Sequence, residues 1–173
     1  MSLSVTLVDN MTSIRPIQLN ESSSIIVSFF RVDRDTSKSQ HLCSPDILVV
    51  AFQGKYRYGS AGNADADYMR AMAEAGLFAT SPTSLILDFS ELAYEWGDKI
   101  EWVLDSGIGK HGDSFFPMAV VVDDGCADGL QSLIRGTNSE DPIDDNQTFF
   151  WSVDDAITKI YKQIDDYRKS IAM

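Results

Sequence analysis

The chain has 173 residues, a formal net charge of −12 and 44% hydrophobic residues. This length corresponds to roughly one domain, and the hydrophobic fraction excludes a globally disordered chain. The longest apolar run, residues 47–52, has the length of a strand and is too short to span a membrane. Residues 1–10 lack the basic start and apolar core of a signal peptide, so we expect a cytoplasmic protein.

The negative charge is distributed unevenly along the chain. Residues 1–45 contain four acidic and four basic residues, whereas residues 46–173 contain 22 acidic and 10 basic residues. An acidic domain without a Lys/Arg cluster repels phosphate groups, which argues against nucleic acid and anionic membrane surfaces as partners. The sequence therefore favours a protein partner, and the acidic surface would suit a basic one.

The first half of the chain contains two strands and a helix. Residues 1–23 have no sustained period and are interpreted as an irregular lead-in. The β-branched and aromatic composition of residues 24–32 and 46–53 predicts two strands, joined by a polar stretch as an antiparallel pair. A loop with three glycines follows, and Asp65 is then predicted to cap a helix with apolar residues at helical spacing.

The second half alternates strands with helices. Strands are predicted at residues 84–89, 117–122 and 148–151, because these runs are short and almost fully apolar. A helix is expected over residues 97–106, and Asp124 is expected to cap a short helix that ends before Gly136. The last helix is long, and its cap is expected to be Ser152 or Asp154.

This order predicts a single α/β domain over residues 24–173. Apolar strands that alternate with helices are typical of a mainly parallel sheet with helices packed on it. The two leading strands would form its antiparallel N-terminal edge. The apolar residues of the last helix recur every 3.5 residues on average, which fits packing on the sheet or a helix–helix contact between two copies. The oligomeric state stays open.

Motifs for cofactors and nucleophilic catalysis are weak. Two cysteines, Cys43 and Cys126, are too few for a disulfide framework or a four-ligand zinc site, so we expect no metal and no cofactor. Residues 107–112 match the letters of a dinucleotide-binding loop but follow a helix instead of a strand. His41 lies two residues from Cys43, in a polar loop that does not favour a catalytic pair.

Carboxylates at strand ends leave an enzymatic alternative open. Asp123 and Asp124 follow a predicted parallel strand, where open α/β sheets place their sites, and Asp88 ends the neighbouring strand. Such oxygens could bind a cation such as Mg²⁺. The alternative function is therefore an acidic-site hydrolase or a metal-dependent phosphoryl-transfer enzyme.

The most unusual segment connects the strand at residues 84–89 to the next helix. It contains Tyr94, Glu95, Trp96, Gly97 and Asp98, and so combines two aromatic and two acidic side chains at the start of a helix. Aromatic side chains are enriched at the centres of protein interfaces. We interpret these five residues as a partner-binding site, with no catalytic residue among them.

Residues 47–164, about two thirds of the chain, resemble a STAS domain, the family of bacterial anti-sigma-factor antagonists and sulfate-transporter tails. The similar pieces are ILVVAFQGKY, DADYMRAMAEA, LILDFSELAYEWGDKI, PMAVVVDDG and FFWSVDDAITKIY. The resemblance implies a non-enzymatic regulatory module that binds another protein. A second resemblance, to non-catalytic members of the crotonase and Clp-protease superfamily, rests on MAVVVDDGCADG.

The resemblance to STAS domains includes one informative departure. The family typically reads Leu-Asp-Leu-Ser-x-Leu, followed by an aromatic residue and Asp-Ser-Ser-Gly, in which a serine is phosphorylated by a partner kinase. Residues 87–92 (LDFSEL) match the first part, but residues 96–99 read WGDK where Asp-Ser-Ser-Gly is expected. Asp98 falls on the phosphoserine position, where its carboxylate would imitate a permanently phosphorylated serine with one charge instead of nearly two.

Overall fold

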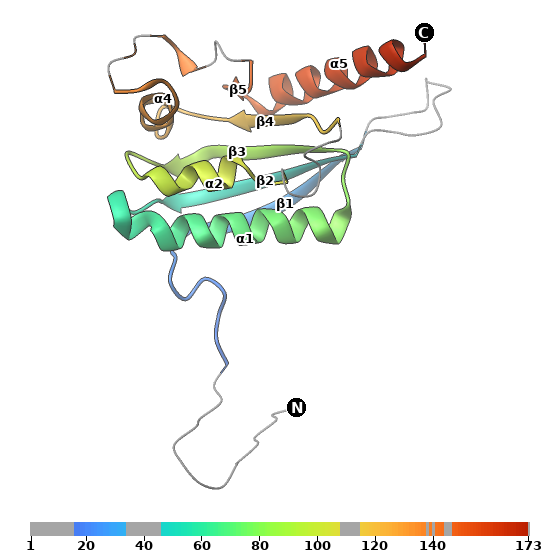
Figure 1. Ribbon diagram of the computed structural model, residues 1–173. Coiled ribbons are helices and arrows are strands. Elements are labelled where there is room, and N and C mark those ends of the chain that lie inside the picture. Colours follow the sequence, from blue (N-terminus) through green and yellow to red (C-terminus); the bar gives the residue numbers. More distant parts are fainter. Residues whose placement is uncertain are drawn as a thin grey trace, which may run out of the picture.

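The computed structural model describes residues 16–33, 46–107, 115–137, 139, 141–143 and 147–172. Their strands form one five-stranded sheet in the order β1-β2-β3-β4-β5 (Figure 1). The bounds are β1 Ile26–Asp33, β2 Asp46–Lys55, β3 Ser84–Ala93, β4 Met118–Val121 and β5 Phe149–Phe150. The first two strands pair antiparallel and the remaining neighbours pair parallel, as the sequence predicted.

The connecting helices cover one face of the sheet. Each parallel strand is followed by the next one along the sheet, and right-handed crossovers that all step in one direction place their helices on the same face. The core on this face contains residues of α1, α2 and α4 together with alternate residues of β2 and β3. These helices span α1 Asn63–Thr80, α2 Glu101–Leu104 and α4 Ala127–Arg135, and short 3₁₀ turns precede α1 (η1, Gly59–Gly62) and α2 (η2, Asp98–Ile100).

A single helix, α5 (Val153–Ile171), covers the opposite face. Ala156, Ile160 and Ile164 pack against the remaining alternate strand residues, such as Ile47 and Ile86. The predicted apolar positions of this helix therefore face the sheet as far as Ile164, whereas Tyr167 and Ile171 near its end are exposed. Together the two faces make the doubly covered α/β architecture that the sequence indicated.

Two predicted helix caps are wrong, and one is right. Asp65 lies inside the first turn of α1 and is fully buried, because its carboxylate binds Arg57 instead of capping the helix. Cys126, and not Asp124, occupies the N-cap position of α4, without a side-chain cap. Ser152 caps α5 as expected, and its hydroxyl accepts a hydrogen bond from the Asp155 amide at 3.1 Å.

Strand β3 continues four residues beyond its predicted end at residue 89. The pairing of β2 with β3 shifts register between Ala51 and Gln53, which oppose Asp88 and Glu91, so β3 contains one extra residue. This bulge turns both Phe89 and Leu92 to the core, although their spacing of three residues does not fit an alternating strand. The broken alternation explains why the sequence pattern ended the strand too early.

No helix among the described residues is long and apolar enough to cross a membrane. Several predictions fall outside the described residues. These are the irregular start of the chain up to residue 15, the pair formed by His41 and Cys43, and the glycine-rich run after Gly107.

Candidate functional site

Residues 94–97 follow β3 at the end of the sheet where the parallel strands have their carboxyl ends, and η2 begins at Asp98. Three backbone hydrogen bonds hold this segment to neighbouring connections. The Tyr94 amide donates to Gly125 at 3.0 Å, the Gly59 amide donates to the Trp96 carbonyl at 3.0 Å, and the Tyr56 amide donates to Ala93 at 2.9 Å. The loop is thus fixed from both sides, by the connection after β2 and by the one after β4.

Tyr94 lies beneath the loop and not on its surface. Its side chain is 2% exposed, and its ring packs edge-on against Tyr56 with centroids 5.2 Å apart. The Tyr94 hydroxyl donates to the Gly97 carbonyl at 3.1 Å. Burial raises the pKa of Tyr94 well above its usual range and raises the pKa of Tyr56 to about 12, with nearby carboxylates adding to the second shift. Both phenols therefore stay neutral and act as supports.

Two glycines allow the close packing of this loop. Gly97 has φ +154°, and a Cβ atom there would lie 2.8 Å from Cε1 of Tyr56. Gly129, in the first turns of α4, would place a Cβ atom 2.7 Å from Cδ1 of Tyr94 and 2.8 Å from its carbonyl oxygen. Such distances exclude a larger side chain unless the neighbouring backbone shifts. Glycine at both positions thus allows the loop to pack directly against Tyr56 and α4.

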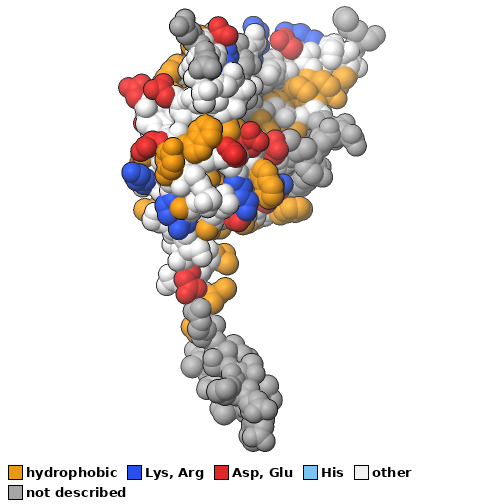
Figure 2. All heavy atoms as spheres, turned by 60° about the vertical axis from the view of Figure 1, so that its left-hand side comes forward, with side chains coloured by type: hydrophobic (Ala, Val, Ile, Leu, Met, Phe, Trp, Pro, Cys, Tyr) orange, Lys and Arg blue, Asp and Glu red, His pale blue; other side chains and the backbone are white. Residues whose placement is uncertain are grey.

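The remaining loop side chains face solvent. Glu95 and Asp98 are exposed, Trp96 is half-buried, and Glu95 forms a loose ion pair with Lys55 at 3.8 Å. Figure 2 shows this end of the molecule, where hydrophobic side chains lie among acidic and basic ones. Of the five residues that the sequence singled out, three thus contribute exposed groups, while Tyr94 and Gly97 support them from below.

Neighbouring elements add residues that the sequence interpretation missed. Trp102 on α2 is 51% exposed and lies between two cations, with Lys99 5.0 Å and Arg70 5.7 Å from its ring. Lys99 also binds Asp67 on α1 at 2.7 Å. Trp102 lies between the buried residues Ile100 and Val103 in the sequence but off the apolar face that they form, and this position is the signal that could have identified it. Tyr58, 69% exposed in the connection after β2, completes this set.

A hollow of about 330 Å³ adjoins the loop on the side of α4. Trp96 and Glu95 form one wall, and Asp124 and Asp128 contribute carboxylates from the other. We call the exposed loop residues, Tyr58, Trp102 and this hollow the loop surface. It combines large aromatic groups with excess negative charge, which suits a partner that presents basic side chains beside apolar ones.

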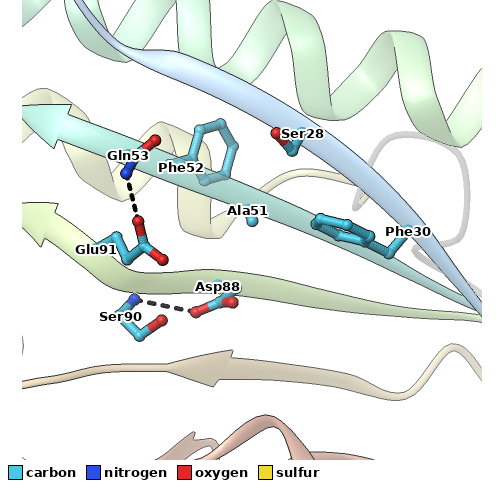
Figure 3. Close-up of a pocket in the computed structure, with 8 residues that line it drawn as sticks. All are labelled: Ser28, Phe30, Ala51, Phe52, Gln53, Asp88, Ser90 and Glu91. Carbon is cyan, nitrogen blue, oxygen red and sulfur yellow. Dashed lines mark hydrogen bonds between the residues drawn. The ribbon is translucent and has the colours of Figure 1, made fainter.

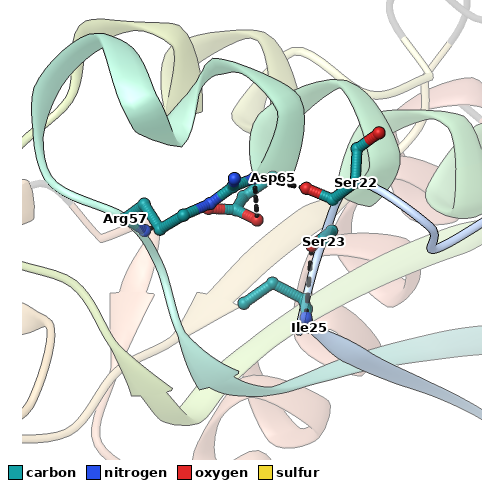
Figure 4. Close-up of polar contacts among 5 residues, drawn as sticks. All are labelled: Ser22, Ser23, Ile25, Arg57 and Asp65. Atoms are coloured by element: carbon teal, nitrogen blue, oxygen red, sulfur yellow. Dashed lines mark hydrogen bonds and ion pairs between the residues drawn. The ribbon is translucent and has the colours of Figure 1, made fainter.

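A buried ion pair fixes the connection on which the loop rests. Asp65 is fully buried and accepts hydrogen bonds from the Arg57 amide at 3.0 Å and from its guanidinium at 2.9 Å (Figure 4). Arg57 also donates to the carbonyl of Ser22, and the Ser23 hydroxyl binds Asp65. Burial alone would raise the pKa of Asp65, but these hydrogen bonds outweigh it and lower the pKa.

Two of the three carboxylates of the enzymatic alternative accept local backbone hydrogen bonds. Asp88 accepts from the Ser90 amide at 3.0 Å, and Asp123 accepts from the Gly125 amide at 2.9 Å. In the described part of the chain, no three His, Cys, Asp or Glu side chains are grouped so that they could hold a metal ion. Cys126 is buried beside them, and burial raises its pKa to about 12.

A second hollow, of about 230 Å³, lies on the sheet face that α5 covers (Figure 3). Ser28 and Phe30 of β1 line one side, and Asp88, Ser90 and Glu91 of β3 line the other. Glu91 binds the Gln53 amide at 2.5 Å. No sequence signal pointed to this hollow, because it results from the bulge in β3 and lies on a part of the sheet that α5 does not cover.

No protein-family model and no curated protein matches this sequence. Among solved structures, the fold resembles that of an anti-sigma factor antagonist from Mycobacterium paratuberculosis, with a TM-score of 0.45 and 21% sequence identity. The similarity covers 76% of this chain and 92% of that chain. This likeness concerns the fold and does not assign a role to any residue.

Proposed function

We propose that this protein is a non-enzymatic regulatory module that binds another protein through the loop surface. The observation that carries the proposal is the exposure of Trp102 and Tyr58, beside the half-buried Trp96, around a loop that buried groups hold in place. Large aromatic side chains on a preorganised surface bind partners with little loss of conformational entropy. The resemblance of the sequence to STAS domains supports the same kind of function.

The charge of the loop surface defines the expected partner. Glu95, Asp98, Asp124 and Asp128 are all exposed. A basic partner would gain long-range attraction from these carboxylates, mostly as a faster association rate. Asp98 holds the place of the family's phosphoserine, so we propose that binding does not require phosphorylation at this position.

A comparison of two tryptophans tests the proposal. Trp102 and Trp151 are 51% and 50% exposed, but Trp151 follows β5 at the far edge of the sheet. We expect Trp102→Ala and Trp96→Ala to weaken capture of a specific partner from native lysate at least about tenfold, the loss typical of a hot-spot residue. Trp151→Ala should capture as well as wild type, because it removes an equal aromatic area elsewhere.

If capture fell equally in all three variants, the tryptophans would contribute only nonspecific hydrophobic binding. This result would contradict the assignment of the binding site to the loop surface. Urea unfolding of each variant provides the control for folding, since an exposed tryptophan contributes little to stability. Asp98→Ser, measured alongside, tests the position of the carboxylate. If Asp98→Ser gains or loses capture of the partner, the result would support a regulatory surface in which aspartate replaces the phosphorylated serine. Equal capture would remove Asp98 from the proposal.

The enzymatic alternative has a separate test. A Mg²⁺ or Mn²⁺ titration followed by calorimetry should show heat of binding that disappears in Asp123→Asn if the strand-end carboxylates form a metal site. Indifference of the wild-type protein to both ions would end that alternative. No contact among the described residues favours it over protein binding.

A further inference from the structure

The two sides of the loop surface differ in charge. On the side of α2, the ring of Trp102 lies between the cations of Lys99 and Arg70. On the side of α4, the hollow beside the loop has the ring of Trp96 and three carboxylates in its lining. None of the described residues that line this hollow is a lysine or an arginine. The hollow therefore combines an aromatic ring with negative charge and supplies no cation of its own.

The carboxylates of this hollow are free to bind a cation. Asp124 and Asp128 are exposed, and in the described part of the chain neither forms an ion pair. Glu95, the third carboxylate, pairs only loosely with Lys55 at 3.8 Å, and both side chains are more than 70% exposed. Such a pair contributes little and exchanges readily. Carboxylates that share one hollow repel one another, and a cation among them relieves this repulsion.

The position of the hollow at the start of α4 raises the alternative of a bound anion. This helix begins without a side-chain cap, and the free N–H groups of a helix N-terminus attract anions. Here Asp128 already places a carboxylate in the first turn, and Asp124 adds a second beside it. A phosphate or carboxylate ligand would meet these two charges, so the hollow selects a cation.

The spacing of the carboxylates indicates which cation fits. No three acidic, histidine or cysteine side chains of the described residues lie close enough to hold a metal ion. The hollow has a volume of about 330 Å³, at the lower end of the range of ligand pockets. Carboxylates spread over such a space suit an extended organic cation, of the size of one side chain, better than a compact ion.

We propose that this hollow receives one arginine side chain of the partner protein, with its guanidinium group between Asp124 and Asp128 and against the ring of Trp96. The inference rests on the proposed function and specifies the partner's chemistry. A guanidinium group is planar, stacks on aromatic rings and has five N–H donors that match carboxylates in pairs. The ammonium group of lysine has three donors and no flat face, so it would use the carboxylates but not the ring as fully.

The chain contains three tryptophans, and each indole N–H gives a separate signal in a ¹⁵N–¹H correlation spectrum. The experiment is a titration of the full chain with acetyl-arginine amide at constant ionic strength, with the signals assigned from Trp→Phe variants. The Trp96 signal should shift with a dissociation constant on the order of 1–10 mM, as expected for a single side chain. The Trp151 signal should stay in place, because the hollow beside Trp151 contains Lys159.

Three further probes separate charge from shape. Acetyl-citrulline amide has nearly the shape of the arginine probe without its charge, and it should bind at least about tenfold more weakly. Acetyl-lysine amide should bind about threefold more weakly than the arginine probe. Inorganic phosphate should leave the Trp96 signal unchanged. Citrulline or lysine binding as tightly as arginine, or a shift with phosphate, would overturn the proposal.

A matched pair of variants separates the hollow from the overall charge. Asp128→Asn should weaken binding of the arginine probe at least about threefold. Asp154→Asn removes the same charge from the first turn of α5 and should bind like wild type, because Asp154 lies outside the hollow. Equal weakening in both variants would contradict the site, as would a Trp96 signal that does not move at about 50 mM probe.

This test does not depend on the partner. If the arginine probe fails to bind while Trp102→Ala still loses capture, the arginine pocket is wrong and the protein-binding function stands. If the probe binds at Trp96 but capture is the same in Trp102→Ala, Trp96→Ala and wild type, the pocket stands and the proposed protein-binding function of the loop surface is wrong.

Discussion

Asp65 shows how much a single residue contributes to the site from a distance. Its carboxylate is fully buried, yet four hydrogen-bond donors from Arg57 and Ser23 surround it. These bonds tie the lead-in before β1 to the connection after β2. That connection in turn donates the hydrogen bond from Gly59 to Trp96. A fully buried residue thereby helps to set the position of Trp96, which is half-buried at the surface.

We expect Asp65→Asn to lower the free energy of unfolding by about 2–3 kcal/mol at pH 7, since it removes charge-assisted hydrogen bonds from Arg57. The pKa of Asp65 is lowered in the folded protein, so its contribution is present above the unfolded pKa of about 3.9 and is lost as the pH falls through the folded value. Urea unfolding at pH 7 and pH 3 measures both effects.

Asp67→Asn is the matched control, two residues away on the same helix. Asp67 is 58% exposed and binds Lys99, so its loss should cost less than about 1 kcal/mol. An equal loss in both variants, or a difference between Asp65→Asn and wild type that widens below pH 4, would contradict this interpretation of the buried pair.

Sequence reasoning placed Asp65 at the right end of the right helix but gave it the wrong partner. A capping pattern depends on neighbours in the chain, whereas Arg57 reaches Asp65 from eight residues away through a turn. Tyr94 shows the same limit. Its place in the loop was predictable, but its burial depends on Tyr56 and Gly129, which the folded chain brings from two other connections.

At the scale of elements, strand and helix types were predictable because their apolar periods are strong. Ends were less so. The bulge in β3 inserts one residue, and the alternation that identifies a strand then changes phase at Ser90 and Glu91. Likewise α4 begins without a side-chain cap, so no polar residue marks its start. Both ends are set by pairing and packing across the sheet, which a local pattern does not contain.

The contact between α4 and the loop gives a prediction for an element. In Gly129→Ala the new Cβ atom would meet the ring and carbonyl of Tyr94 at under 3 Å, so the helix and the loop must separate. We expect a loss of about 1–3 kcal/mol in the free energy of unfolding. Partner capture should weaken as well, although no exposed residue changes.

Ser132→Ala, one turn further along α4, is the control for that experiment. Ser132 lines the hollow beside the loop, and its change to alanine adds no atom to the contact between α4 and Tyr94. Thermal unfolding and partner capture are measured on both variants. Normal stability and capture in Gly129→Ala would show that the loop does not depend on α4 for its position.

At the scale of the whole molecule, the topology was predictable because each crossover follows from alternating strands and helices. The antiparallel edge followed from two neighbouring strands joined without a helix. What the sequence did not reveal is which part of the sheet stays uncovered. That depends on the angle at which α5 crosses the strands, a property of packed side chains from every strand at once.

The net charge of −12 predicts a salt response for the loop surface. Raising NaCl from about 50 to about 500 mM screens attraction to a basic partner, so capture at the loop surface should weaken. A capture assay over this salt series measures the effect. Capture that does not change with salt would contradict a contribution from the exposed carboxylates.

The single helix on one face of the sheet has a consequence for how the chain folds during synthesis. The apolar residues on this face become covered only when α5 packs on them, and α5 is synthesised after all five strands. These residues are Ile47, Val49, Ile86, Ala119 and Val121. While the ribosome adds residues 122–152, this apolar face of the sheet has no cover of its own. A nascent chain stalled at that stage would be a substrate for chaperones, and α5 would displace them as it docks.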